Sequence, residues 1–217
     1  MRRLATTLCL ASLPFLQVSG AFASDIIWEV QNPFRFFKKP AAFALHEKAF
    51  DAVRGKADAP VTVVEYADFQ CPACGLFATT MEAGIVKDYV DTGKVRLVFH
   101  DFPLPQHANA IAAAEAARSA ADQGAFWPYH DLLYAKQAEW ENSPQPLAQF
   151  AAYAEQLKLD RSKFEASFNS HAHQAAIMQL YQDSNNGGVN QTPTFVIDGK
   201  AYYANELRTG IDAALNK

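Results

Sequence analysis

Residues 61–74 have the sequence VTVVEYADFQCPAC, in which a run of β-branched and aromatic residues leads directly to two cysteines. The first half is short and apolar, as expected for a buried strand. A helical pattern follows and ends at a glycine. The pattern therefore predicts a strand over 61–67 and a helix over 72–92, with Cys71 and Cys74 at the turn between them.

The rest of the chain extends this unit on its C-terminal side. A second strand over 95–100 completes a βαβ unit. Strands over 194–197 and 201–203 form a hairpin, and Asn205 is expected to cap a last helix. Between the two β regions, helices are expected over 107–121, 126–139, 146–157, 162–168 and 172–183. We expect an α/β sheet with an all-helical insertion, at about 104–188, between its βαβ and ββα halves.

Composition limits the classes of protein to consider. The chain has 217 residues, of which 50% are hydrophobic, so a disordered chain is excluded and one domain with an insertion is expected. The formal net charge is −4 at pH 7. An acidic chain with scattered charges is a poor electrostatic match for nucleic acid, which we do not expect as a partner.

The first residues have the pattern of an export signal. Arg2 and Arg3 precede an apolar run from Leu4 to Val18, and Ala21-Phe22-Ala23 resembles a cleavage site. The apolar run is shorter than the ~20 residues that span a bilayer, which disfavours the alternative of an uncleaved membrane anchor. We therefore predict a cleaved signal peptide over 1–23.

A leader is expected over residues 24–58, in front of the main domain over 59–217. Its last part, from about Ala41 to Arg54, has an amphipathic pattern that predicts a short helix burying Phe43, Phe50 and Val53. No motif in this leader indicates a function.

Once the signal is removed, Cys71 and Cys74 are the two remaining cysteines, and they close too small a loop to stabilise the fold much. A thiolate is the attacking species in disulfide exchange, and a helix N-terminus lowers a cysteine pKa from about 8.5 to roughly 3.5–7.5. Pro72 fits the first helical turn, which places Cys71 at that terminus. We expect Cys71 to be the exposed nucleophile and Cys74 the buried resolving thiol, with no cofactor beyond their disulfide.

Zinc is the alternative use of two cysteines at this spacing. A structural zinc site needs four ligands, which a second cysteine pair or a spaced histidine pair would supply. No further cysteine remains, and His171 and His173 are only two residues apart. We expect no metal.

Glu65 lies in the middle of the apolar strand, on the same face as Val61 and Val63. If both faces of the sheet are covered, its carboxyl group has a raised pKa and can accept the proton of Cys74. The alternative is a glutamate that faces water at the edge of the sheet.

Pro193 follows Thr192 and opens a strand, a position that proline tolerates. A cis Thr192–Pro193 bond would expose backbone groups to which a substrate chain could add as a strand. Phe69 and Phe102 are candidates to line an apolar substrate groove. The alternative for His100, His107 and His130 is that they flank the site or supply protons, but we expect each to be structural or solvent-exposed.

Three separate motifs resemble the DsbA-like disulfide oxidoreductases, which have a thioredoxin fold. They are residues 63–74 (VVEYADFQCPAC), 126–131 (FWPYHD) and 192–199 (TPTFVIDG), in the order of the family. The resemblance implies that Cys71 and Cys74 are the redox pair, Pro193 a cis-proline and Glu65 the buried acid.

One departure concerns the dipeptide between the cysteines. It is Pro72-Ala73, whereas strong oxidants of the family have a histidine before the second cysteine, so a weaker oxidant is expected. The leader matches no element of the family.

The expected function is that of a periplasmic oxidoreductase that introduces disulfides into unfolded or reduced exported proteins, with a DsbB-like membrane oxidase restoring its own disulfide. One alternative is a reductase or isomerase kept reduced by a DsbD-like membrane donor. Another is a non-enzymatic chaperone or metal carrier that uses the same groove.

Overall fold

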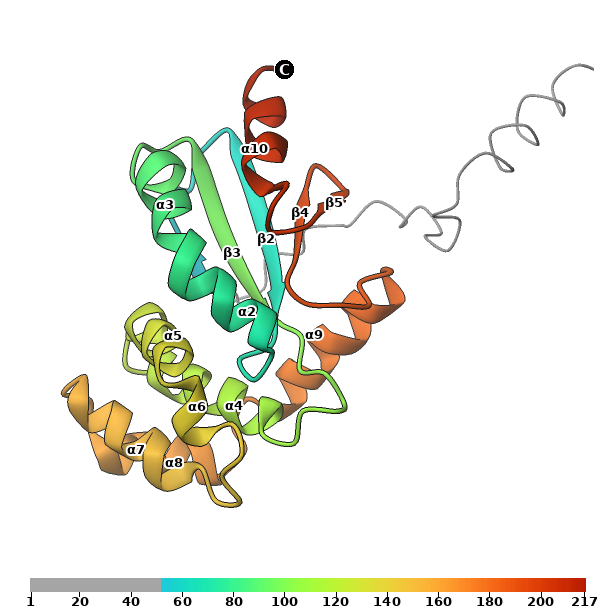
Figure 1. Ribbon diagram of the computed structural model, residues 1–217. Helices are drawn as coiled ribbons and strands as arrows, with labels where there is room; N and C mark the ends of the chain where they lie inside the picture. The colour runs from blue at the N-terminus through green and yellow to red at the C-terminus, as the bar shows by residue number, and fades with distance from the viewer. Residues whose placement is uncertain (1–51) are drawn as a thin grey trace, which may run out of the picture. The chain divides into compact units, whose positions relative to one another are not determined.

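The computed structural model describes residues 52–217, which contain a five-stranded sheet of order β1-β3-β2-β4-β5 (Figure 1). The strands are β1 (Ala52–Arg54), β2 (Val61–Ala67), β3 (Val95–Asp101), β4 (Thr194–Ile197) and β5 (Lys200–Tyr202). β2 and β3 are parallel, and the other pairs are antiparallel. β2 lies between β3 and β4, so the strand that leads to the cysteines is central in the sheet.

A nearly continuous helical segment connects β2 to β3 and covers one face of the sheet. It consists of α2 (Pro72–Phe77), a wider π turn η1 (Ala78–Glu82), α3 (Ala83–Ile85) and a second π turn η2 (Val86–Val90). Gly93, with φ +75°, ends the segment in a conformation that favours glycine. Apolar side chains of this segment pack on those of the strands, such as Phe77 on Phe195 at 4.7 Å between ring centroids.

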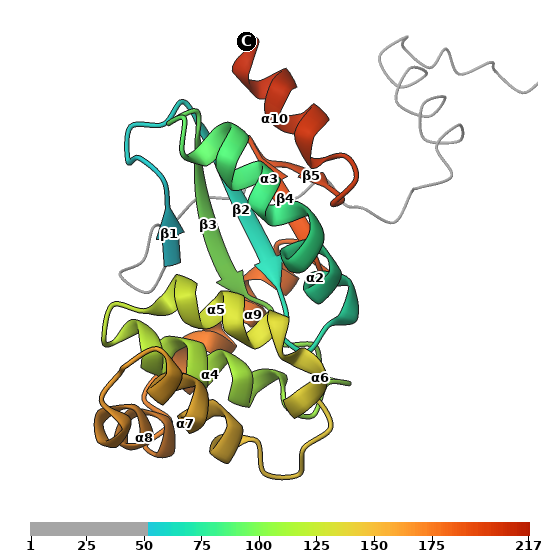
Figure 2. The same cartoon turned by 60° about the vertical axis from the view of Figure 1, so that its left-hand side comes forward.

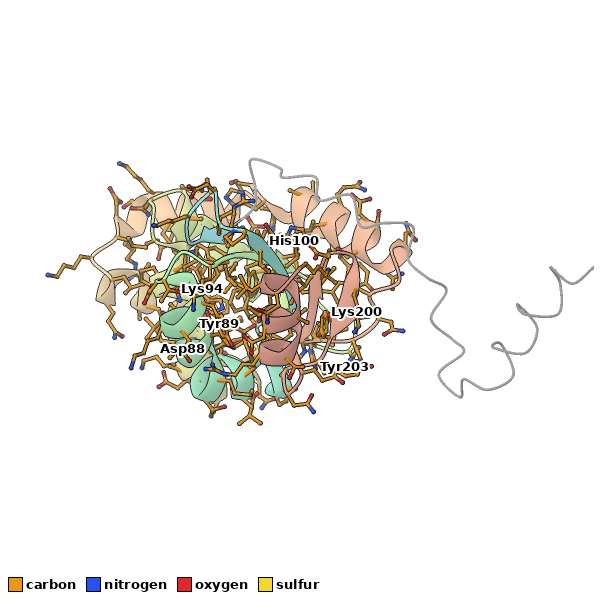
Figure 3. The ribbon with its side chains drawn as sticks, turned by 90° about the horizontal axis from the view of Figure 1, so that it is seen from above. Asp88, Tyr89, Lys94, His100, Lys200 and Tyr203 are labelled. Carbon is orange, nitrogen blue, oxygen red and sulfur yellow. The ribbon has the colours of Figure 1, made fainter. Side chains whose placement is uncertain are left out.

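The C-terminal helix α10 (Leu207–Leu215) packs beside this segment on the same face. The Tyr89 hydroxyl donates to Asp212 at 2.9 Å, and Arg208 pairs with Asp88 at 2.7 Å. Figure 3 shows where Asp88 and Tyr89 lie on this segment. These contacts hold the end of η2 against α10.

The opposite face of the sheet is covered by α9 (Gln174–Asn186). Tyr181 of α9 packs on a core that includes Tyr66, Val98 and Phe102. Both faces of β2 are therefore buried, which accounts for its nearly uninterrupted apolar sequence.

The helical insertion packs at the end of the sheet where β2 and β3 finish (Figure 2). Before α9 it contains α4 (Ala110–Ala121), α5 (Phe126–Ala135), α6 (Gln137–Trp140), α7 (Leu147–Gln156) and α8 (Arg161–Asn169). The alanines of α4 let the neighbouring helices approach closely around buried Tyr129, Trp140, Phe150 and Phe164. A buried ion pair, Arg118 to Asp101 at 2.6 Å, ties α4 to the end of β3.

The fold agrees closely with the sequence prediction. The strands at 61–67 and 194–197 have the predicted bounds, and the helices of the insertion differ by a few residues at their ends. Within residues 52–217, no helix is long and apolar enough to span a membrane.

Four expectations about local structure are wrong. Residues 52–54 are an edge strand on β3 instead of the end of a helix, because their backbone pairs with Leu97 to Phe99. The helix expected over 126–139 is interrupted at Lys136. Asn205 does not cap α10, which begins after Glu206 without a side-chain cap. The helix expected from His107 begins only at Ala110.

The signal peptide and most of the leader, with Phe43 and Phe50, lie outside the described residues.

Candidate active site

Cys71 occupies the N-cap position of α2, where the loop after β2 turns into the helix. Its backbone is extended, with φ −69° and ψ 124°, and Pro72 takes the first helical position as predicted. Cys71 N donates to Asp68 O at 3.0 Å, and Cys71 O accepts from Gly75 N at 3.0 Å. The side chain of Cys71 is therefore held where unpaired N–H groups at the start of the helix face it.

The pKa of Cys71 is lowered from 9.0 to about 5. The largest cause is a hydrogen bond from the thiol of Cys74 to the Cys71 sulfur. The Thr192 hydroxyl and the N–H groups of Cys74 and Ala73 add to it, and burial opposes them. Cys71 is therefore mostly a thiolate at neutral pH.

Cys74 behaves in the opposite way. Burial raises its pKa well above 9.0, and the neighbouring Cys71 raises it further. Both cysteines are free thiols in this structure. Cys74 thus remains protonated while Cys71 is ionised, which fits the predicted division into an attacking and a resolving thiol.

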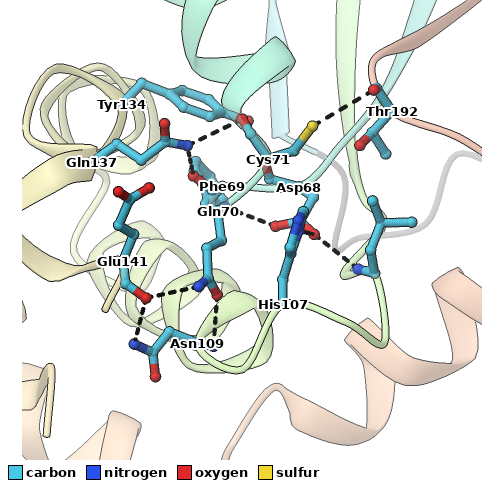
Figure 4. A network of polar contacts seen from close by, with 11 residues as sticks. Asp68, Phe69, Gln70, Cys71, His107, Asn109, Tyr134, Gln137, Glu141 and Thr192 are labelled. Atoms are coloured by element: carbon cyan, nitrogen blue, oxygen red, sulfur yellow. Dashed lines mark hydrogen bonds and ion pairs between the residues drawn. The ribbon is translucent and has the colours of Figure 1, made fainter. Parts of the chain in front are cut away.

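The prediction that Cys71 is exposed is wrong, because the side chain is buried in this structure. Its exposed fraction is 6%, compared with 1% for Cys74. The loop before β4 partly covers it, with the carbonyl oxygen of Thr192 3.6 Å from Sγ of Cys71 (Figure 4). Pro72 and Ala73 beside it are exposed, so a substrate can approach over these two residues.

The Thr192–Pro193 peptide bond is cis, as the resemblance implied. Thr192 lies against the cysteines, and its hydroxyl oxygen is buried without a hydrogen-bond partner of its own. This hydroxyl lowers the pKa of both cysteines, because it can donate to a thiolate. Thr192 therefore contributes a side-chain donor to the site, which the sequence analysis did not anticipate.

A network of polar contacts fixes the loop between β2 and α2 to the helical insertion (Figure 4). Gln137 Nε2 donates to Phe69 O at 2.7 Å and to Cys71 O at 3.1 Å. Gln70 Nε2 donates to Glu141 O at 2.7 Å, and Gln70 Oε1 accepts from Asn109 N at 2.6 Å. The insertion thus positions the backbone that carries Cys71.

Asp68 anchors the same loop from inside. Its carboxylate accepts from Gln70 N at 2.7 Å and Leu104 N at 2.8 Å, and lies 2.6 Å from His107 Nδ1. Burial raises the pKa of Asp68, although these hydrogen bonds oppose the shift. His107 therefore has the structural role expected for it.

Sequence reasoning missed this network for two different reasons. Asp68 and Gln70 lie beside Cys71, so their position was a usable signal. Asn109 and Gln137 are far away in the chain, and no pattern in the sequence connects them with the cysteines.

Glu65 is buried in the centre of the sheet, with an exposed fraction of 1%. One carboxyl oxygen has no hydrogen-bond partner. Burial raises the pKa of Glu65 well above its usual value, Glu82 raises it further, and Arg54 opposes the shift. The predicted burial and pKa direction are confirmed, whereas the water-facing alternative is wrong.

Phe69 does not line a substrate groove. Its exposed fraction is 1%, its ring stacks on Phe99 at 5.1 Å, and it lies tilted against Tyr134 at 5.0 Å between ring centroids. Phe102 is equally buried and packs against Tyr181. Both are core residues, because Phe69 packs among side chains of the helical insertion and Phe102 packs against α9.

A family model described as thioredoxin matches residues 48–217. Disulfide bond formation protein D of Bacillus subtilis is 31% identical over 153 residues, which cover 68% of this chain and 68% of that protein. Na(+)/H(+) antiporter NhaA 3 of Salinispora tropica is 42% identical over 154 residues, which cover 70% of this chain but 22% of the antiporter. The chain thus spans less than a quarter of the length of this relative.

Solved structures show the same fold. Oxidised BdbD of Bacillus subtilis superposes with a TM-score of 0.68 at 25% identity, over 76% of this chain and 92% of that chain. For alpha-DsbA1 of Wolbachia pipientis the TM-score is 0.69 at 23% identity, over 79% of this chain and 94% of that chain. The second likeness concerns the fold alone.

Proposed function

Because the chain belongs to the thioredoxin family, and within it to the DsbA-like thiol–disulfide oxidoreductases, we propose that it donates a Cys71–Cys74 disulfide to reduced or unfolded exported proteins. The observation that carries this proposal is the low pKa of Cys71 beside the high pKa of Cys74. The two thiols of one pair are thereby made chemically unequal.

The reaction follows from this inequality. A substrate thiolate attacks Sγ of Cys71 in the oxidised protein, the S–S bond breaks, and Cys74 leaves as a thiolate that takes up a proton. A second thiolate of the substrate then attacks the substrate sulfur that is bonded to Cys71, which forms the substrate disulfide and releases Cys71 as a thiolate. Two electrons pass from the substrate to the protein, which ends with both cysteines reduced.

The proposed direction rests on the stability of the released group. A Cys71 thiolate with a pKa of about 5 is a good leaving group at pH 7, and its stability favours the reduced form of the protein. Ala73 supplies no cationic side chain, so the stabilising donors are Cys74, Thr192 and the start of α2. We therefore propose an oxidant weaker than members with a histidine at this position.

The proposed location is the periplasm, after removal of residues 1–23. Transfer of the disulfide consumes it, so a DsbB-like membrane oxidase is the proposed partner that restores it. A DsbD-like donor would take that place if the protein works as a reductase or isomerase.

Equilibration of the protein with glutathione buffers tests the direction. After thiols are blocked, the fraction of reduced protein gives the potential, which we expect to lie above the roughly −270 mV of thioredoxin. A potential below that value would support the reductase.

Trapping tests the chemistry itself. Cys74→Ala should accumulate mixed disulfides with exported proteins that carry a disulfide, because its Cys71 thiolate breaks that disulfide and no resolving thiol releases the adduct. Cys71→Ala is the matched control and should form none. A chaperone or metal carrier would give no such adducts with either variant.

A further inference from the structure

A second cluster of titratable groups lies between η1 and α5, apart from the cysteines. Glu82 of η1, His130 and Asp131 of α5 each offer a nitrogen or oxygen atom within 4.8 Å of the others. His130 is fully buried and Glu82 nearly so, whereas the Asp131 side chain is 57% exposed. The cluster therefore extends from the interior to the surface.

The two ring nitrogens of His130 face different carboxyl groups. Nδ1 lies 2.8 Å from Asp131 Oδ1, and Nε2 lies 3.9 Å from Glu82 Oε2 with no hydrogen-bond partner. Burying a ring nitrogen without a hydrogen-bond partner destabilises the folded state, so its presence here calls for a functional explanation. The rings of Phe69, Phe99, Phe126, Trp127 and Tyr134 surround the imidazole and hold its orientation.

Glu82 connects this cluster with Glu65. Each has a raised pKa, mainly because of burial, and the charge of Glu82 raises the pKa of Glu65. Tyr134 interacts electrostatically with both acids, and also with Cys74 and Asp68. Geometry gives the same connection, since Glu65 is paired with Phe99 across β2 and β3 and the Phe99 ring lies 5.2 Å from the ring of His130.

A metal ion is not the occupant that this geometry favours. Arg54 of β1 lies 3.5 Å from Glu82 and 3.6 Å from Asp131, so a permanent cation already sits between the two carboxyl groups. Arg54 is itself held 4.4 Å over the ring of Trp127. The edge strand thus supplies the countercharge of the cluster.

Building on the proposed disulfide exchange, we propose that Glu82, His130 and Asp131 form a proton path between solvent and Glu65. Glu65 in turn exchanges a proton with Cys74. These residues hold and pass protons, and Arg54 positions them.

The proton balance closes over one catalytic cycle. When Cys74 leaves as a thiolate, it takes a proton from the Glu65 carboxyl, and Glu82 returns one to Glu65. Rotation of the Glu82 carboxyl group brings it to hydrogen-bond distance of His130. His130 then gives its Nε2 proton to Glu82 and gains a proton at Nδ1 from solvent through the Asp131 carboxyl group. Reoxidation of the cysteines drives the protons outward and restores the original tautomer of His130.

The test uses the full-length oxidised protein and reduced glutathione, with tryptophan fluorescence reporting single-turnover reduction. Proton transfer by a positioned side chain typically contributes ~100-fold or more to the rate, so we expect the rate of His130→Phe to fall about 100-fold at pH 7 in dilute buffer. Phenylalanine keeps the aromatic packing. The rate of the variant should rise with buffer concentration, whereas the wild-type rate should not.

Asp131→Asn is the second variant, since this half-exposed residue can be changed even if His130→Phe does not fold. It keeps an acceptor for Nδ1 but cannot exchange a proton with solvent, so the same slower, buffer-dependent rate is expected. Glu115→Gln is the matched control. Glu115 is another buried acid, bonded to His173 N at 2.9 Å, and its replacement should change nothing.

Three results would overturn the proton path. The rates of both variants could equal the wild-type rate, they could fall without becoming buffer-dependent, or the equilibrium constant with glutathione could fall as much as the rate. If the wild-type protein does not exchange with glutathione at all, the proposed function fails as well. Wild-type exchange together with unaltered variants refutes the proton path alone.

Discussion

The low pKa of Cys71 has a consequence for folding that can be measured without any substrate. Its pKa is about 5 in the folded protein and 9.0 in an unperturbed cysteine. A depressed pKa stabilises the folded state fully above the unfolded pKa, and this stabilisation is lost as pH falls through the folded pKa. The reduced protein should therefore lose stability between pH 7 and pH 4 relative to Cys71→Ser, which has no thiolate.

The magnitude follows from the two pKa values. At pH 7 the thiol of the unfolded protein is protonated. Because pH 7 lies about two units above the folded pKa of about 5, ionisation of Cys71 stabilises the folded state by ~2.7 kcal/mol. Cys74 stays protonated in both states over this range, so it adds nothing. Other titrating groups are common to both proteins and cancel in the difference.

Urea unfolding of both reduced proteins at several pH values between 4 and 7 gives the difference directly. Above pH 5, the free energy of unfolding of the wild-type protein should rise by ~1.4 kcal/mol per pH unit relative to that of Cys71→Ser. Parallel stability curves for the two proteins would refute the low pKa.

Three further predictions follow from the same geometry. Thr192→Val removes one hydroxyl donor, so the pKa of Cys71, measured by thiolate absorbance, should rise by about one unit or more, since a hydrogen bond to a charged group is worth ~1.5–3 kcal/mol; an unchanged pKa would contradict this role. Gly75→Ala places a Cβ 2.7 Å from Gln137 Oε1, so it should displace Gln137, and a double-mutant cycle in urea should show that Gln137→Ala adds little to it; additive losses would mean that Gln137 does not move. Glu65→Gln should be more stable than the wild-type protein at pH 7 but not below pH 4, because a carboxyl group with a raised folded pKa destabilises the folded state once the pH exceeds its unfolded pKa. Equal stability of the two proteins at both pH values would place Glu65 in contact with water.

The fold was predictable because its signals are local. The strand at 61–67 is β-branched, Pro72 marks the first turn of α2, and the glycines at 93 and 187 follow helices. β1 was not predictable, since three residues carry no periodic pattern and their strand conformation depends on pairing with β3. Tertiary context decides such short segments.

The site was predictable only where chemistry is concentrated in one motif. Cys71, Cys74 and Glu65 lie within ten residues, and their burial and position follow from one strand and one turn. Gln137 and Arg54 approach this motif from the insertion and from the edge strand, so only the folded chain shows their contacts. Phe69 was misplaced for the same reason, because the helices that bury it are distant in the sequence.

Residue-specific alkylation of the reduced protein tests the central claim most directly. The rate of iodoacetamide modification, resolved for each cysteine by peptide mass spectrometry, is followed from pH 3 to pH 10. Cys71 should react with a midpoint near pH 5, while Cys74 remains unreactive beyond pH 9. A Cys71 midpoint near 9, or equal reactivity of the two thiols, would contradict the account.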